Sequence, residues 1–503
     1  MKKSSICVLS LAVTATLFGE AAKDDDRSGP QCIQRTMKAL EESTAEHPAK
    51  LRFLFYGQSL VEQGWCTNIL ANLHRRYPTA QIEWDNFAVG GFESPLLIRS
   101  AEADLYPTYA DLVFFNDYGS TDLVRTMIER LRARTTSEII LWTDRVRKGQ
   151  DPKKTINEDD ARSLSLKSIA ADNGCLLVHV MRKWSRHLID KGLDPMHYLS
   201  DGVHLKAESG AFQLIADCIT EDMVRVSGCE GVPASGTITT YPFTSGNYGD
   251  SRILPPSVEH EDGTIEFSFT GNRVVAEAVG WRGCYNASPT KVLLDGKEMS
   301  TMKELYHHGR VSGLLSWMPI VLNVESEKTP VAEDWTLTYV EGTEPAGFPI
   351  KYRVDGSVTG FDGFGRTDRD FVSNSGRVKL LATDFHSWQY DYFVRRKEEK
   401  TGKLSPCRAA AGQWTTWRTH ANFTDRIWTY LKPSERFVLV SGCPNGRHTL
   451  TFVPAIRGRR PMLRSLTVYA PAGTGGAVTE EERKAVAARV PVNPDFDPNK
   501  KKK

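Results

Sequence analysis

The sequence predicts an α/β domain built on a parallel sheet with helices on both faces, followed by an all-β domain of the sandwich or jelly-roll kind. Between residues 51 and 230, near-continuous apolar strands alternate with amphipathic helices, which is typical of a parallel sheet that is buried on both faces. After residue 233, short alternating strands and turn signals replace the helical pattern. The chain has 503 residues, 40% of them hydrophobic, and this length suggests two or three domains.

The α/β pattern resolves into individual elements. The apolar runs predict strands over residues 51–57, 80–91, 111–117, 138–144 and 174–180. The four-residue spacing of apolar side chains predicts helices over residues 60–77, 121–135 and 157–172, and a last helix with Phe212, Ile215, Ile219 and Met223 along one stripe. In a parallel sheet of this kind, binding sites form beyond the carboxyl ends of the strands.

The second part, residues 233–475, reads as all-β. Ile265, Phe267 and Phe269 alternate along one strand, and further strands are expected over residues 334–340, 376–383 and 464–471. The Asp295-Gly296 and Asn445-Gly446 pairs are typical of hairpin turns. These residues could form one elaborate sandwich or two small ones.

The amino-terminal residues indicate export. Residues 1–22 combine two lysines, a short apolar run and small residues, which is typical of a secretory signal peptide. Residues 23–50 are expected to form a leader with a short helix over residues 31–42, and residues 476–503 a disordered basic tail. No later run is apolar and long enough to span a membrane. We therefore expect a secreted or periplasmic protein.

The net charge and the cysteines limit which partners and cofactors are expected. The net charge of +2 argues against a nucleic-acid-binding protein, which would show a basic excess. Cys7 lies in the signal peptide, and the eight cysteines that remain permit disulfides without requiring them. Cys175 and Cys218 fall in apolar patterns and are expected to pack in the core. No Cys-x-x-Cys pair and no histidine cluster indicates a metal site, so we expect no metal or cofactor.

Polar residues follow three consecutive strands of the predicted sheet. Ser59 comes after the first strand on a Gly-Gln-Ser turn, where a serine is either a helix cap or a nucleophile. Gly90 and Gly91 follow the second strand and would let backbone N–H groups approach a ligand closely. Asn116 follows the third strand and could donate its amide to an oxyanion.

Asp201 and His204 complete a possible triad. They lie three residues apart in a loop just before the last helix. This spacing lets the carboxylate hold the Nδ1–H of the imidazole and leaves Nε2 free to act as a base.

Together these residues resemble the SGNH hydrolases, also called the GDSL-like lipase/acylhydrolase family. That family carries a serine after the first strand, a glycine after the second, an asparagine after the third and Asp-x-x-His before the last helix. The resemblance covers about residues 51–226. It implies a flavodoxin-like three-layer fold and ester hydrolysis through an acyl-enzyme.

The resemblance also implies individual roles. Ser59 would be the nucleophile, His204 the base and Asp201 the residue that orients the base. The N–H groups of Ser59 and Gly91 and the side chain of Asn116 would form the oxyanion hole, with Gly91 favoured over Gly90 by its spacing from the strand.

The sequence departs from the family pattern at two positions. Gln58 stands where the family usually has an aspartate before the serine. The third block aligns in two ways, because Gly119-Ser120-Thr121-Asp122 could replace the strand-end asparagine and would put Thr121 at the donor position. We favour Asn116.

The expected function is that of a secreted serine esterase that removes ester groups, most simply O-acetyl groups, from a polysaccharide or glycan. Tryptophans of the β domain could stack on sugar rings or fill its core: Trp281, Trp317, Trp335, Trp388, Trp414, Trp417 and Trp428. Two alternatives stay open, an esterase acting on small or lipid esters and a non-catalytic carbohydrate-binding protein on a degenerate hydrolase fold.

Overall fold

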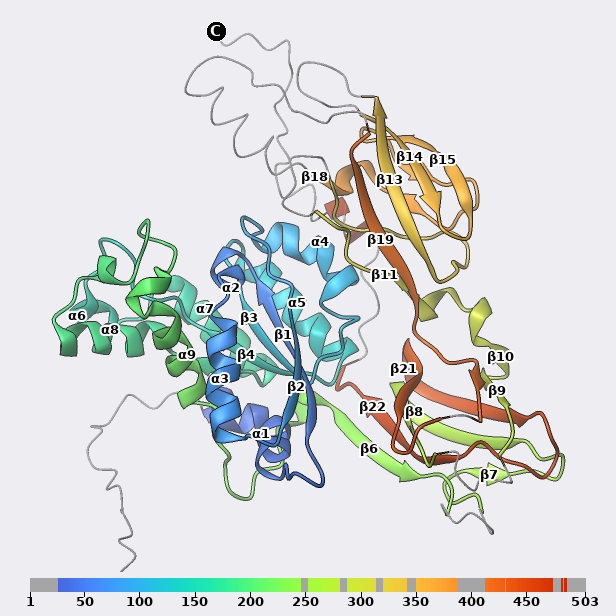
Figure 1. The fold of residues 1–503 in the computed structure, drawn as a ribbon. Coiled ribbons are helices and arrows are strands. Elements are labelled where there is room, and N and C mark those ends of the chain that lie inside the picture. Colours follow the sequence, from blue (N-terminus) through green and yellow to red (C-terminus); the bar gives the residue numbers. More distant parts are fainter. Residues whose placement is uncertain are drawn as a thin grey trace, which may run out of the picture.

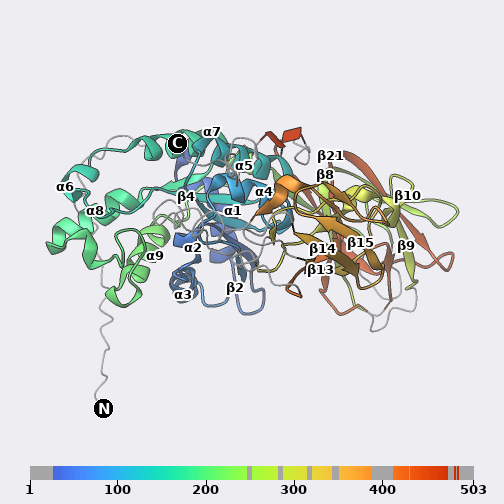
Figure 2. The same ribbon diagram turned by 90° about the horizontal axis from the view of Figure 1, so that it is seen from above.

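The computed structural model of the chain contains an α/β unit and two antiparallel β units, which lie side by side (Figures 1 and 2). It describes residues 26–245, 252–280, 287–313, 320–341, 350–386, 412–429, 431–473, 481–482 and 484–485. The expected signal peptide and nearly all of the expected basic tail lie outside these residues. Among the helices of the described residues, none has both the length and the apolar character needed to cross a bilayer.

The described residues of the α/β unit form a five-stranded parallel sheet in the order β2-β1-β3-β4-β5. Its strands are β1 (Lys50–Gly57), β2 (Gln81–Asn86), β3 (Leu112–Asn116), β4 (Glu138–Trp142) and β5 (Leu176–Val178). Every residue of β3 and β4 is buried. The predicted parallel sheet is therefore confirmed.

Helices cover both faces of this sheet and complete the three layers (Figure 1). One face packs against α1 (Gln34–Glu41), α3 (Cys66–Arg76), α8 (Val180–Lys191) and α9 (Ala211–Glu221). The other packs against α4 (Ser94–Asp104), α5 (Thr121–Arg134) and α7 (Ala161–Asn173). Two short helices, α2 (Ser59–Glu62) and α6 (Pro152–Thr155), lie in connections. Met37 and Leu40 of α1, which belong to the expected leader, are buried in the first of these cores.

The continuous helix predicted over residues 60–77 was wrong. The segment forms two helices, α2 and α3, separated by Gln63, Gly64 and Trp65. Gly64 has a φ of 84°, a left-handed conformation that ends the first helical turn and favours glycine. The buried Trp65 then packs against Phe55 and Trp142, with ring centroids 6.3 and 5.5 Å away.

The first β unit is an eight-stranded sheet in the described residues. Its main path is β10-β9-β21-β8-β22-β6, with β7 paired to β8 and β20 paired to β9. The strands are β6 (Thr237–Pro242), β7 (Val258–Glu259), β8 (Ile265–Ala278), β9 (Thr290–Leu294), β10 (Lys297–Glu298), β20 (Arg426–Ile427), β21 (Arg436–Pro454) and β22 (Leu463–Ala470).

The second β unit is inserted in the chain between β10 and β20. Its main sheet runs β11-β19-β13-β14-β15, formed by β11 (Tyr306–His308), β13 (Glu333–Glu341), β14 (Lys351–Gly356), β15 (Gly360–Arg366) and β19 (Trp414–Ala421). Two small ribbons accompany it: β12 (Ile320–Val321) with β18 (Phe385–His386), and β16 (Phe371–Val372) with β17 (Lys379–Leu380). Each β unit has a separate apolar core, so the described residues form two units rather than one elaborate sandwich.

The two predicted hairpin turns had different outcomes. Asp295-Gly296 joins β9 to β10 with both φ angles positive, 50° and 74°, as predicted. The prediction of a hairpin at Asn445-Gly446 was wrong, because both residues lie within the single long strand β21. The register of β21 against β8 shifts there, between Ser441 and Gly446. The Asn445 side chain donates to the carbonyl oxygens of Pro471 and Gly473, so this turn signal belongs to a bulge.

Tryptophans and cysteines of the described residues fall mainly in the cores. Trp335 and Trp417 are buried, whereas Trp414 and Trp428 are exposed. Trp281, Trp317 and Trp388 lie outside the described residues. Cys175 and Cys218 are buried as predicted, and the six described cysteines carry free thiols: Cys32, Cys66, Cys175, Cys218, Cys229 and Cys443. Cys284 and Cys407 are not described.

The second β unit docks firmly on the α/β unit. Ile320 and Leu322 belong to the apolar core beneath α4 and α5. Beside them the fully buried Arg99 of α4 pairs with buried Asp384, 3.3 Å away. A third contact joins Arg310, in the loop after β11, to the buried Asp104 at 3.8 Å. Removing one member of a buried ion pair leaves an uncompensated charge, so these contacts hold one orientation of the two units.

Asp104 should make the unfolding stability of the chain depend on pH. Burial raises the pKa of its carboxyl group from 3.8 to about 7, even though Arg310 and the Tyr56 hydroxyl lower it. Between about pH 4 and about pH 7 the folded chain keeps a proton that the unfolded chain loses, so stability falls as the pH rises.

Asp104→Asn removes this titration. We expect the stability of the variant relative to the parent to increase from about pH 4 to about pH 7 and then to level off. Urea unfolding of both chains across this range measures the difference. A difference that stays constant with pH would contradict the assignment.

Candidate active site

Ser59 lies just beyond the carboxyl end of β1, the strand between β2 and β3. Gly57 pairs with Asn116 in the sheet and has a φ of 156°. A Cβ atom at this position would collide with the backbone carbonyl oxygen of Asn116, so only glycine allows the two strands to approach this closely. Ser59 is the first residue of α2, and Gln58, not Ser59, occupies the N-cap position. The alternative role of Ser59 as a helix cap is therefore not realised.

Ser59, His204 and Asp201 form a continuous chain of hydrogen-bond contacts. Ser59 Oγ lies 2.9 Å from His204 Nε2, and His204 Nδ1 lies 2.7 Å from Asp201 Oδ2. Because an ionised carboxylate only accepts hydrogen bonds, Nδ1 carries the ring hydrogen and Nε2 presents its lone pair to the serine. This is the arrangement that serine hydrolysis needs between nucleophile, base and orienting acid.

The loop that carries His204 also stabilises the charge of Asp201. Asp201 Oδ1 accepts hydrogen bonds from the backbone N–H groups of His204 and Val203, at 2.8 and 2.9 Å. The His204 N–H and then the His204 side chain hold the pKa of this carboxyl group well below its usual range. Asp201 therefore stays ionised throughout the neutral and moderately acid range and keeps the imidazole in one tautomer.

Gln58, which replaces the usual aspartate of the family, touches the nucleophile. Its buried side chain places Oε1 2.7 Å from Ser59 Oγ, and its Nε2 has no hydrogen-bond partner among the described residues. The single hydrogen of the serine hydroxyl cannot serve both Gln58 Oε1 and His204 Nε2. Turning the amide over lets Nε2 donate to Ser59 Oγ and leaves the hydroxyl hydrogen for His204. We therefore expect the Gln58 amide to donate to Ser59 Oγ, so that the serine hydroxyl donates its hydrogen to His204 Nε2.

Gln63 joins the nucleophile helix to the loop of the base. Its Nε2 donates to the carbonyl oxygen of Leu205, and its Oε1 accepts the Leu205 N–H, both at 2.9 Å. This two-point contact fixes the residue next to His204 against the end of α2. No pattern in the sequence indicated this role, since the two residues are 142 positions apart.

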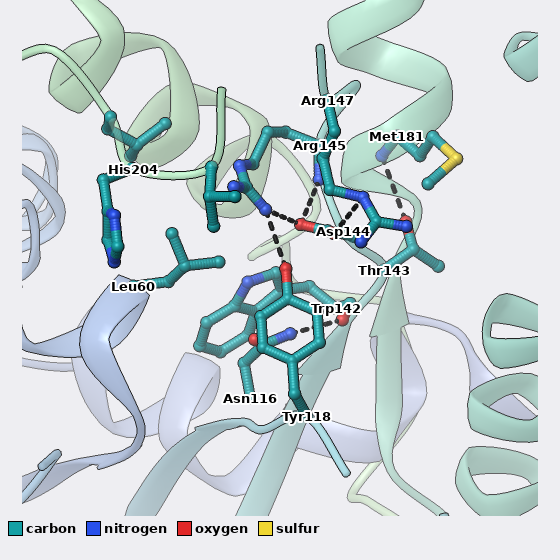
Figure 3. A network of polar contacts seen from close by, with 12 residues as sticks. Leu60, Asn116, Tyr118, Trp142, Thr143, Asp144, Arg145, Arg147, Met181 and His204 are labelled. Carbon is teal, nitrogen blue, oxygen red and sulfur yellow. Dashed lines mark hydrogen bonds and ion pairs between the residues drawn. The ribbon is translucent and has the colours of Figure 1, made fainter. Parts of the chain in front are cut away.

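A polar network supports the loop after β4, beside the base (Figure 3). The buried Arg145 donates to the Tyr118 hydroxyl at 2.7 Å and contacts Asp144, which also pairs with Arg147 at 3.4 Å. Further along the same loop, the Lys148 N–H donates to the carbonyl oxygen of Gly202, between Asp201 and His204, at 3.3 Å. The network therefore ties the end of β4 to the loop that holds the base.

Asn116 lies at the end of β3 as predicted, but its amide is engaged. Nδ2 donates to the carbonyl oxygen of Trp142 at 2.9 Å, which joins the ends of β3 and β4 (Figure 3). One amide hydrogen of Asn116 remains for another acceptor. Thr121, the alternative donor, is the first residue of α5, just after the N-cap Ser120.

The glycines after β2 differ in their surroundings. A Cβ atom on Gly90 would lie 3.7 Å from the Cβ of Ser59, so the Gly90 backbone runs directly beside the nucleophile. A Cβ atom on Gly90 would also lie 2.6 Å from Glu62 Oε2, so the Glu62 carboxylate is close to this backbone, and burial raises the pKa of that carboxyl group. Gly91, the predicted oxyanion donor, follows in a left-handed conformation with a φ of 77° and is exposed.

A cleft of about 320 Å³ opens beside the nucleophile, between the α/β unit and the second β unit. Its lining residues are Glu62, Ala88, Val89, Arg310, Val311, Ser312 and Gly313. Glu62 lies one helical turn beyond Ser59, and Arg310 stands over the ring of Phe87 at 5.3 Å. Sequence reasoning missed Arg310, because the inserted unit brings it to the cleft from a distant part of the chain.

The described residues contain no cluster of histidine, cysteine, aspartate or glutamate side chains that could hold a metal ion. His307 and His308 instead contact Asn422 at 2.8 Å and Ser326 at 2.7 Å.

Among known proteins, the chain shows similarity to solved structures. No family model and no curated protein matches the chain. The chain is similar to a two-domain esterase (CEX) active on acetylated mannans, co-crystallized with mannopentaose, with 12% identity over 89% of this chain and 96% of that chain and a TM-score of 0.33.

Two single-domain structures match about a third of the chain. One is the W215I variant of Axe2, an acetyl xylan esterase from Geobacillus stearothermophilus, with 19% identity over 36% of this chain and 96% of that chain and a TM-score of 0.30. The other is a putative GDSL-like lipase from Parabacteroides merdae, with 14% identity, 34% and 95% coverage and a TM-score of 0.29. Because these likenesses are distant, the chemistry is inferred from the chain's own residues. The observed sheet and the order of the site residues along it are those that the resemblance to the SGNH hydrolases implies.

Gln63→Leu tests the bridge between the nucleophile helix and the base loop. The substitution keeps the side-chain size but leaves the Leu205 N–H and carbonyl without their partners, so His204 loses part of its support. We expect kcat for an acetate ester to fall roughly 10- to 100-fold, since small displacements of catalytic groups are costly.

Gln213→Leu is the matched control. Gln213 of α9 makes a similar side-chain contact to Asn68 of α3, and its substitution should leave kcat within about twofold. Equal losses in the two variants would mean that the Gln63 bridge has no special role.

Proposed function

We propose that this chain is a serine esterase that removes O-acetyl groups from carbohydrates through an acyl-enzyme. The observation that carries the proposal is the contact chain from Ser59 Oγ through His204 to Asp201, with separations of 2.9 and 2.7 Å. Both separations lie in the range needed for proton transfer between positioned groups. They favour a catalyst over a carbohydrate-binding protein on a degenerate hydrolase fold.

Each residue has a defined part in the reaction. The Ser59 hydroxyl attacks the acetyl carbonyl carbon while His204 Nε2 takes its proton, and Asp201 stabilises the imidazolium that forms. Collapse of the tetrahedral intermediate expels the sugar alkoxide, which takes that proton and leaves as an alcohol. Water then attacks the acetyl-serine with His204 again as the base, and acetate leaves. These steps use only protein groups and water.

The oxyanion hole is assigned to backbone N–H groups around the nucleophile turn. We propose the N–H of Ser59 and the N–H of Gly91, with the remaining amide hydrogen of Asn116 as a third donor. Each such donor typically contributes about 2.7–4 kcal/mol to transition-state stabilisation.

The cleft supports a carbohydrate substrate. The carboxylate of Glu62, the guanidinium of Arg310 and the hydroxyl of Ser312 offer charged and polar partners for sugar hydroxyl groups. We also propose export, on the basis of the signal-like first 22 residues.

Ser59→Ala tests the reaction directly. Without its nucleophile the chain should release acetate from acetylated xylan, mannan or pectin at least about 10⁴-fold more slowly than the parent. Acetate is measured enzymatically, beside turnover of a small activated acetate ester. Parent activity that survives the substitution, or a parent inactive on every glycan and on the small ester, would refute the proposal.

Arg310→Gln tests the role of the β unit in substrate binding. Because Arg310 lines the cleft but is not part of the triad, we expect KM for an acetylated glycan to rise roughly threefold to tenfold more than KM for a small acetate ester. Arg353→Gln is the control, since Arg353 pairs with Asp355 on the same β unit without lining the cleft. Equal KM changes for the two substrates would place Arg310 outside the binding site.

A further inference from the structure

A second, larger cavity lies where the three units of the chain meet. Its volume is about 530 Å³, within the range of about 300–1,000 Å³ that is usual for small-molecule sites. The α/β unit contributes Tyr109 and Arg134, the bulge of β21 contributes Asn445, and the second β unit contributes His307 and Asn323. We refer to it as the junction cavity.

The junction cavity is separate from the triad. Tyr109 precedes β3, and Arg134 ends α5 just before β4, so both belong to the amino-terminal edge of the parallel sheet. Ser59 lies at the opposite edge, beyond the carboxyl end of β1. A ligand in the junction cavity therefore leaves the catalytic residues free.

Hydrogen bonds between the units fix the shape of the cavity. The Tyr109 hydroxyl donates to Asn272 Oδ1 at 2.8 Å, and Asn272 Nδ2 donates to the carbonyl oxygen of Arg134 at 2.7 Å. The Arg134 side chain is paired with Glu102 at 2.6 Å and covers the ring of Tyr106. A wall that is already ordered loses little conformational freedom when a ligand binds.

One lining residue carries a buried donor without a described partner, and another carries a neutral imidazole. Asn323 is 4% exposed, and its Nδ2 has no hydrogen-bond partner among the described residues. A buried donor without a partner is uncommon in folded proteins and indicates a missing acceptor. His307 Nδ1 contacts Asn422 Oδ1 at 2.8 Å, so that nitrogen carries the hydrogen and Nε2 is an acceptor. Burial, together with the neighbouring His420, lowers the pKa of His307 to about 4, which keeps the ring neutral.

The charge of the lining selects against anions. Three carboxylates, Glu102, Glu304 and Glu325, face two cations, Arg134 and Lys303, so the cavity does not attract an anion. The described residues also place no metal-binding cluster there. Neutral amide, imidazole and phenol groups provide the remaining polar lining, and they both donate and accept. A neutral ligand with many hydroxyl groups matches this set.

We propose that the junction cavity binds a short stretch of a neutral glycan, as an ancillary site distinct from the catalytic cleft. Asn323 donates to a sugar oxygen, and His307 accepts from a sugar hydroxyl. The site holds the polysaccharide on the enzyme while the triad acts on another part of the same chain.

Hydrogen–deuterium exchange tests the proposal on the full-length Ser59→Ala chain, which binds without turnover. The probes are xylohexaose and mannohexaose, with tri-galacturonate as an anionic comparison. We expect at least one neutral probe to slow exchange in peptides covering residues 133–134 and 441–445, which line the junction cavity and not the cleft. Absence of this protection with both neutral probes, or stronger protection by tri-galacturonate, would overturn the proposal.

Calorimetry on variants in the same Ser59→Ala background locates the binding. Asn323→Leu removes the open donor, and His307→Phe removes the acceptor at similar size. Each should weaken binding of the better probe roughly tenfold, the effect of one lost hydrogen bond in a buried site. Asn68→Leu, between α3 and α9, is the control and should bind like its parent. Thermal unfolding verifies that each variant is folded.

Parent-like affinity in folded Asn323→Leu and His307→Phe chains, with binding lost in Arg310→Gln, would assign all binding to the catalytic cleft and overturn the proposal. Because these experiments measure binding without turnover, their outcome is independent of whether the chain is an esterase.

Discussion

The site depends on the close approach of the Gly57 backbone to the carbonyl oxygen of Asn116. This contact brings the ends of β1 and β3 together and determines where the chain leaves the sheet. Because no side chain fits at Gly57, the next two residues can turn directly into α2 and present Ser59 at the sheet edge. The end of β3 then continues through Asn116 to the carbonyl oxygen of Trp142, so three strand ends form one rigid platform beneath the nucleophile.

His204 comes from the carboxyl-terminal part of the α/β unit, and the side-chain amide of Gln63 holds the loop of His204 against α2. Asp201 receives two backbone N–H groups of its own loop, so the orientation of the carboxylate is set locally before it meets His204. Gln63 then connects that loop to α2, while Arg145 and Asp144 order the loop that packs against Gly202. Positioning therefore comes from contacts outside the triad, as expected for a site in which displacements of about 1 Å reduce the rate strongly.

The sequence predicted what is encoded locally and missed what depends on distant contacts. The strands, the order of the polar residues at their ends and the three-residue spacing of Asp201 and His204 follow from short patterns, and the structure brings these groups together. The contact of Gln63 with Leu205 spans 142 positions, and Arg310 arrives on an inserted unit, so no local pattern indicates either. Asn445-Gly446 shows the converse error: its turn signal is genuine, but pairing of β21 with β8 on both sides turns it into a bulge.

The cleft and the oxyanion side of the site share one group, Glu62. Its carboxylate lines the cleft and also lies close to the Gly90 backbone, which runs beside Ser59. Arg310 stands on the other wall of the cleft and lowers the pKa of Glu62, so the second β unit acts on the same carboxylate. The orientation of this wall relative to Glu62 is held by the buried pair of Arg99 with Asp384 and by the contact of Arg310 with Asp104, so the position of the inserted unit determines which groups of it face Glu62 across the cleft.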